Sequence, residues 1–142
     1  MLRSHRRLEG APLHQSDEAR DLIYHFFTDA YHLKDWLRHD PDLALSRTEQ
    51  QALESHISGT VALAWCADVC NGIKHMDLTP GRERIPGKPA KLTSQNVSIM
   101  LGSGGTYSWD VTFDGQKYDV HRLADEIVRE WTAWLQAQGY LQ

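Results

Sequence analysis

Residues 46–76 read SRTEQQALESHISGTVALAWCADVCNGIKHM and carry the longest helical pattern in the chain. Ser46 followed by Glu49 has the spacing of a capping box, which predicts a helix beginning near residue 46. Apolar residues fall on two sides, as is typical of a central helix that packs against more than one partner. One side carries Leu53, Ile57, Val61 and Ala64, and the other carries Leu63, Cys66, Cys70 and Ile73.

The same stretch becomes polar toward its C-terminal end. Steps of three or four residues place six side chains on one helical face, namely Ile57, Val61, Ala64, Asp68, Asn71 and His75. The first three are apolar and the last three are polar. A buried polar group without a partner costs about 1–3 kcal/mol. The pattern therefore indicates either a well-satisfied buried polar cluster or a functional site.

The segments on either side predict a mostly helical α+β protein. Residues 16–39 form an amphipathic helix that ends before Pro41, because the residue preceding proline avoids the helical region. This helix and the stretch 46–76 are expected to pair as an antiparallel hairpin. The apolar face of the first helix consists of Leu22, Phe26, Ala30, Leu33 and Leu37.

A small antiparallel sheet and a C-terminal helix complete the expected fold. Residues 97–101 read as a strand that pairs with 106–113, and Asp114-Gly115 is a two-residue hairpin signal leading into a third strand, 116–118. Asp119 suits the cap of a last helix, 120–138, and Gly139 suits its end. We expect one domain with five parts: a flexible arm or short flanking helix 1–15, a helical hairpin 16–76, a basic loop 77–96, a sheet 97–118 and a C-terminal helix 119–142.

Composition narrows the class of protein. The chain has 142 residues, of which 41% are hydrophobic and 24% charged, as in a soluble globular domain. A net charge of −4 excludes an overall positive field that would attract nucleic acid or membrane, so such contact requires a local patch. No apolar run approaches the roughly 18 residues of a membrane span, and no secretory signal is present. Two cysteines one helical turn apart do not make a disulfide framework, so we expect a cytoplasmic protein.

The polar end of the 46–76 stretch supplies the candidate catalytic residues. An imidazole ordinarily titrates near neutrality, so His75 suits proton transfer; Asn71 can orient it, and Asp68 adds a carboxylate. The candidate substrate contacts are cations in or next to the proline- and glycine-rich loop 77–96, namely Lys74, Arg82 and Arg84. The alternative is that these side chains cap the helix end and hold the loop.

No metal site and no cofactor are expected. One edge of the first helix carries His25, Asp29, His32, Trp36 and His39. Zinc requires a closed group of ligands, which a single helix edge cannot supply. Cys66 and Cys70 lie on an apolar face, where thiols usually belong to the core.

Two segments resemble known families. Residues 30–37 read AYHLKDWL and residues 68–75 read DVCNGIKH. Together they resemble a family of small uncharacterised bacterial and phage proteins with an AYHLKDW helix and an NGxKH helix end. The hairpin signal at Asp114-Gly115 and the tryptophan-containing last helix fit the same pattern, so the resemblance covers nearly the whole chain.

The chain is also similar to the HEPN superfamily, whose helical domains often act as metal-independent ribonucleases through an Arg-x4–6-His motif. This resemblance implies that His75 is the motif histidine and Asn71 its polar position. Cys70 stands where the arginine is expected, and Lys74 is the nearby cation. The sheet between the helices is a further departure from a plain four-helix HEPN bundle.

Two main functions follow from these observations, beside a third option, a metal-binding protein that uses His25, His32 or His75. The first is a HEPN-like cytoplasmic protein that binds or cleaves RNA, with His75 as the proton-transfer group. The second is a non-catalytic protein-interaction module, such as a homodimer, in which Asp68, Asn71 and His75 form a structural cluster. Five tryptophans favour the second function if some are exposed.

Overall fold

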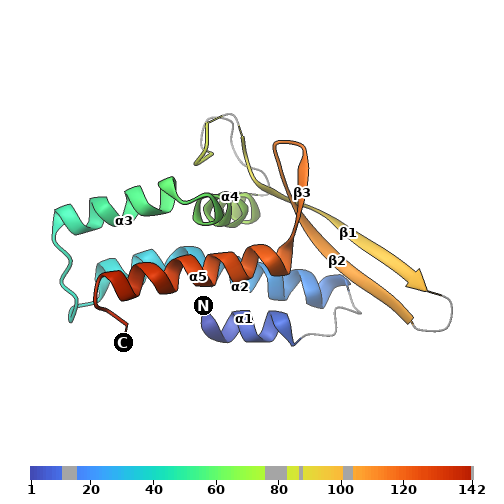
Figure 1. Ribbon diagram of the computed structural model, residues 1–142, viewed down its shortest axis with the longest axis horizontal. Coiled ribbons are helices and arrows are strands. Elements are labelled where there is room, and N and C mark those ends of the chain that lie inside the picture. Colours follow the sequence, from blue (N-terminus) through green and yellow to red (C-terminus); the bar gives the residue numbers. More distant parts are fainter. Residues whose placement is uncertain (11–15, 76–82, 87, 101–103, 142) are drawn as a thin grey trace.

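The computed structural model describes residues 1–10, 16–75, 83–86, 88–100 and 104–141 (Figure 1). These residues form helices and one antiparallel sheet, which confirms the expected mostly helical α+β class. In chain order the elements are α1 (Leu2–Glu9), α2 (Ser16–His39), α3 (Arg47–Gly59), α4 (Val61–His75), β1 (Lys91–Met100), β2 (Gly104–Phe113), β3 (Gln116–Asp119) and α5 (Val120–Ala137).

The N-terminal segment is a helix that belongs to the core. Helix α1 packs against α2 and α5, and its Leu8 side chain is fully buried. Of the two expectations for residues 1–15, the short flanking helix is confirmed for 2–9. Residues 11–15 lie outside the described part of the chain. Because α1 packs against α5, polar side chains of the two helices lie beside each other.

The prediction of one continuous helix over 46–76 was wrong. The predicted capping box is present: the Ser46 hydroxyl accepts the Glu49 N–H at 3.3 Å, and the Ser46 N–H donates to the Glu49 carboxylate at 2.7 Å. However, the helix stops at Gly59, a residue that destabilises helices. Thr60 is extended, with φ −102° and ψ 116°. Thr60 ends α3 by donating its N–H to His56 and starts α4 by accepting the Ala64 N–H.

This break changes which residues share a face. Helices α2 and α3 run in opposite directions, whereas α4 turns across them and is seen end-on in Figure 1. Ile57 therefore lies on a different helix from Asp68, and Val61 is 53% exposed rather than part of an apolar stripe. The second predicted face of α4 is buried as far as it is described, at Leu63, Cys66 and Cys70.

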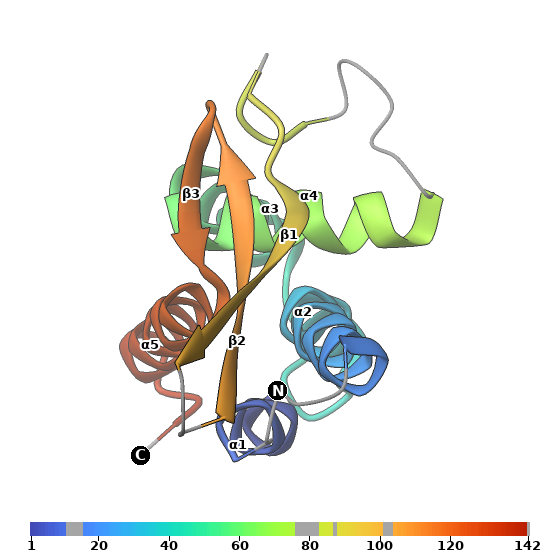
Figure 2. The same ribbon diagram turned by 90° about the vertical axis from the view of Figure 1, so that its right-hand side faces the viewer.

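The sheet has the order β1-β2-β3, with both pairs antiparallel. The predicted pairing of the first two strands is confirmed, with Val97 opposite Tyr107. Positive φ angles at Asp114 (50°) and Gly115 (76°) form the predicted tight turn. Strand β1 begins at Lys91, so residues 91–96 were wrongly assigned to the loop. Figure 2 shows the sheet across one end of the helices, between α5 and α2.

Helix α5 closes the core as the sequence predicted. The Asp119 carboxylate caps it by accepting the Arg122 N–H at 2.9 Å, and Gly139, with φ 76°, follows its end. The apolar stripe of α5 lies against α4, α2 and α1. Its most buried members are Val120, Leu123, Ile127 and Trp131.

Candidate functional site

Asp68 is a fully buried carboxylate in the middle of α4. Its two oxygens accept backbone N–H groups from the following loop, one from Arg84 at 2.9 Å and one from Ala90 at 3.3 Å. Burial raises the pKa of Asp68 above its ordinary value, although the two N–H donors act in the opposite direction. Since both oxygens hold backbone, this arrangement favours a structural role for Asp68 over proton transfer.

The Arg84 side chain contacts two helices, α2 and α3. Its guanidinium donates to the Tyr31 hydroxyl of α2 at 2.8 Å, and to Glu54 and Ser58 of α3 at 3.1 and 3.2 Å. Burial lowers the pKa of Arg84, but Tyr31 and Glu54 outweigh it and keep the pKa above its ordinary value. Arg84 thus carries a permanent charge and fastens the loop to α2 and α3.

Glu54 is the centre of a charged cluster that the sequence did not predict. Lys34 lies 3.1 Å from one of its oxygens, Arg38 lies 2.9 Å from the same oxygen, and Arg84 lies 3.1 Å from the other. We call these four residues the Glu54 cluster. Three cations around one carboxylate leave an excess of positive charge, which Asp35, 4.0 Å from Arg38, offsets in part. The only sequence signal is spacing, because Lys34 and Arg38 are one turn apart on α2.

Replacing Glu54 with glutamine is expected to lower the free energy of unfolding by about 2 kcal/mol at pH 7, between the values of surface and buried ion pairs. Burial favours a higher pKa for Glu54, but Lys34, Arg84 and Arg38 lower it below the ordinary value of 4.5. The stabilisation is therefore present above pH 4.5 and is lost as the pH falls through the lower folded value. Denaturant unfolding across this range should show the difference between the two proteins shrinking in acid. A difference in unfolding free energy between the wild type and Glu54→Gln that stays constant with pH would contradict this prediction.

An open cavity of about 610 Å³ lies beside the Glu54 cluster. We call it the polar cavity because every lining residue is polar: Arg38, Arg47, Gln50, Gln51, Glu54 and Ser55. Arg38 and Glu54 belong to both the cavity and the cluster, whereas Arg47 is exposed on the cavity wall. Two arginines and one carboxylate give the lining a positive balance. The charge and shape suit an anionic ligand that approaches from solvent.

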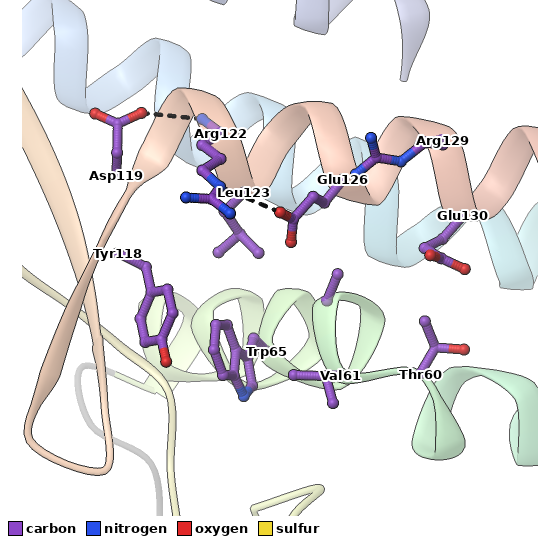
Figure 3. Close-up of a pocket in the computed structure, with 11 residues that line it drawn as sticks. Thr60, Val61, Trp65, Tyr118, Asp119, Arg122, Leu123, Glu126, Arg129 and Glu130 are labelled. Atoms are coloured by element: carbon purple, nitrogen blue, oxygen red, sulfur yellow. Dashed lines mark hydrogen bonds and ion pairs between the residues drawn. The ribbon is translucent and has the colours of Figure 1, made fainter.

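A second pocket, of about 370 Å³, lies between the start of α4, β3 and α5 (Figure 3). Trp65 and Tyr118 form its aromatic side, with ring centroids 4.6 Å apart. Arg122 pairs with Glu126 at 3.4 Å. The full lining has two arginines against three carboxylates, which gives a negative balance and disfavours a phosphate ligand. The charged members are Asp119, Arg122, Glu126, Arg129 and Glu130.

The remaining predicted site residues are placed only in part. Asn71 is half-buried on α4, one turn after Asp68. His75 is the last residue of α4, but its side chain and that of Lys74 lie outside the described residues, as does Arg82. The structure therefore brings Asp68 and Arg84 together through backbone, and it leaves the predicted roles of His75, Asn71, Lys74 and Arg82 as predictions.

The histidine edge of α2 lies at the surface, beside the apolar face. His32 contacts Asp35 at 2.8 Å, and His39 contacts the Asp35 carbonyl at 2.7 Å. Trp36, between them, is 62% exposed, whereas Trp65 and Trp131 are buried. Within the described part of the chain, no group of three metal-ligating residues includes a histidine of this edge.

Both cysteines belong to the core, as the sequence predicted. Cys66 and Cys70 are free and buried, and the Cys66 thiol lies 3.6 Å from the Phe27 carbonyl. Burial raises the pKa of Cys66 well above its ordinary value, which disfavours the reactive thiolate.

Comparison with protein-family models, curated proteins and solved structures found no match to this chain. Among the described residues, no helix has the length and apolar character needed to cross a membrane.

Proposed function

We propose that the protein binds RNA, with the polar cavity and the Glu54 cluster as its phosphate-binding surface. The observation that carries the proposal is the positive excess of the Glu54 cluster at the edge of an open cavity whose lining residues are all polar or charged. In a chain with a net charge of −4, RNA binding requires such a local patch.

The chemistry of the cavity wall fits a nucleic acid strand. Arginine guanidinium groups bind phosphate oxygens with fixed geometry, and Arg38 and Arg47 both face the cavity. Gln50 and Gln51 add amide donors and acceptors, which suit base edges and the ribose 2′-hydroxyl. Arg84 does not line the cavity but adds positive charge to the Glu54 cluster and holds Glu54 in position. This differs from the direct substrate contact that the sequence predicted for it.

Arg47→Glu is expected to weaken binding of a single-stranded RNA about tenfold, or about 1.4 kcal/mol, and to reduce the salt dependence of binding. Arg47 is exposed at the first position of α3, where an acidic side chain favours the helix. The fold should therefore survive the change. Fluorescence anisotropy with a labelled RNA at several salt concentrations measures both effects.

Arg20→Glu is the matched control for this measurement. It makes the same change of charge early in α2, about 27 Å along the helix from Arg38. Among the described residues, Arg20 makes one ion pair, with Asp17. We expect RNA affinity to stay within about twofold of the wild type. Equal losses in the two variants would mean that overall charge, and not the polar cavity, controls binding, which contradicts the proposal.

The HEPN resemblance extends the proposal to RNA cleavage. In this extension His75 transfers the proton and Asn71 orients it. Asn71 and His75 are four residues apart, so they share one face at the end of α4. Asp68 does not take part, because its oxygens are occupied by loop N–H groups.

A second function, protein interaction, is favoured by one observation. Trp36 is a large aromatic side chain in the last turn of α2 and is 62% exposed. Exposed tryptophans are enriched at protein interfaces. Concentration-dependent sedimentation of the wild type that Trp36→Ser abolishes would favour a homodimeric module over an RNA-binding protein.

A further inference from the structure

Three metal-ligating side chains from the two ends of the chain meet on one surface. His5 and Glu9 are one turn apart on α1, and Asp125 lies on α5. His5 Nε2 lies 2.8 Å from Asp125 Oδ1, and His5 Nδ1 lies 3.5 Å from Glu9 Oε2. One ligand atom from each residue can be chosen so that all three lie within 4.8 Å of one another.

The His5 imidazole is largely buried and packed, whereas the Glu9 and Asp125 carboxylates are more than half exposed. The His5 side chain is only 13% exposed, and its ring packs against that of Phe26 with centroids 5.7 Å apart. Fully buried Leu8 anchors the same helix to the core. The Glu9 and Asp125 side chains are 55% and 59% exposed. Because Asp125 faces Nε2 and Glu9 faces Nδ1, the group closes around an ion on one ring nitrogen when the exposed carboxylate on the other side rotates toward that nitrogen.

We propose that His5, Glu9 and Asp125 bind a divalent transition-metal ion such as Zn²⁺, which ties α1 to α5. Imidazole nitrogen and carboxylate oxygen are both zinc ligands, and three protein ligands leave a position for water. The histidine makes the group less suitable for Ca²⁺ or Mg²⁺, which prefer oxygen ligands. The expectation of no metal site rests on spacing within single helices, and these residues meet only in the fold.

The competing explanation is an ion-pair network in which a protonated His5 bridges the two carboxylates without a metal. A matched control is available on α2. His32 contacts Asp35 at 2.8 Å, the same distance as His5 to Asp125, but the pair belongs to no three-ligand group within the described residues. Metal binding requires the third ligand, whereas a histidine–carboxylate contact does not.

Titration of the metal-free protein, residues 1–142, with ZnCl₂ in a calorimeter tests the proposal. We expect saturable binding of one Zn²⁺ per chain and a rise in Tm on zinc addition. Glu9→Gln and Asp125→Asn should each weaken zinc binding at least about tenfold, the usual scale for disturbing a metal site. Both residues are more than half exposed, so these variants should fold. His32→Gln should bind zinc within about twofold of the wild type.

Titration with Co²⁺ gives an independent readout. Visible absorption from bound Co²⁺ should appear in the wild type and in His32→Gln, and be lost in Asp125→Asn. Three results would overturn the proposal: no saturable binding at about 1 mM ZnCl₂, unchanged affinity in both Glu9→Gln and Asp125→Asn, or an equal loss in His32→Gln. His5→Gln provides a further check, with its Tm in the absence of zinc reporting any damage to packing against Phe26.

Discussion

Replacement of Asp68 by alanine is expected to lower the free energy of unfolding by about 3 kcal/mol. The change leaves the N–H groups of Arg84 and Ala90 without their buried acceptor, and each such loss costs about 1–3 kcal/mol. The sum is reduced because burial raises the pKa of Asp68, which shows that the charged carboxylate is itself costly at this position. Urea unfolding of the wild type and the variant measures the difference.

Asp21→Ala is the control for Asp68→Ala. Asp21 is an exposed aspartate on α2, so the change brings the same gain in helix propensity without a buried acceptor. Its effect should stay within about 0.5 kcal/mol. Hydrogen exchange adds a local readout, because the amides of Arg84 and Ala90 should exchange faster in Asp68→Ala. Unchanged stability together with unchanged exchange would show that Asp68 does not hold the loop.

Local signals were sufficient to predict most elements of this fold. The boundaries of α2 follow from an apolar stripe and Pro41, and those of α5 follow from Asp119 and Gly139. Each signal acts through hydrogen bonds or steric limits within a few residues of the chain. The Asp114-Gly115 turn is of the same kind, since positive φ angles at both residues determine the register of the hairpin.

The errors come from places where tertiary packing overrides a local pattern. The apolar periodicity continues across Gly59 and Thr60, so it predicts one helix, although the chain turns there so that α4 can cross α2. The 91–96 segment has no strong strand pattern of its own. It becomes part of β1 because β2 offers it hydrogen-bonding partners, such as Thr112 for Lys91.

The candidate site was predictable only in its separate parts. Asp68 was identified as either functional or structural, and its contacts favour the structural reading. Lys34 and Glu54 are unremarkable surface-type residues in sequence, and only the packing of α2 against α3 brings them together. The pair of His5 and Asp125 is separated by 120 positions, so no spacing rule could have related them.

His75→Ala is expected to slow RNA cleavage at least about a hundredfold while leaving RNA affinity and Tm unchanged. A positioned general acid or base contributes about 10²–10⁴ to a rate, and alanine cannot transfer a proton. Single-turnover cleavage of an end-labelled RNA in the presence of a chelator measures the rate, since the proposed chemistry needs no metal. His32→Ala, which removes a histidine from α2, should cleave at the wild-type rate.

A purely structural role for His75 predicts the opposite results for cleavage and for Tm. If the side chain of His75 only caps the helix end, its removal should lower Tm, and the wild type should not cleave RNA. Asp68→Ala is the reference for a purely structural loss. Because its carboxylate holds the loop by backbone N–H groups, this variant should lose stability under either hypothesis. Loss of cleavage without loss of stability therefore indicates a residue that acts in the reaction and not in the fold, and we expect this result for His75.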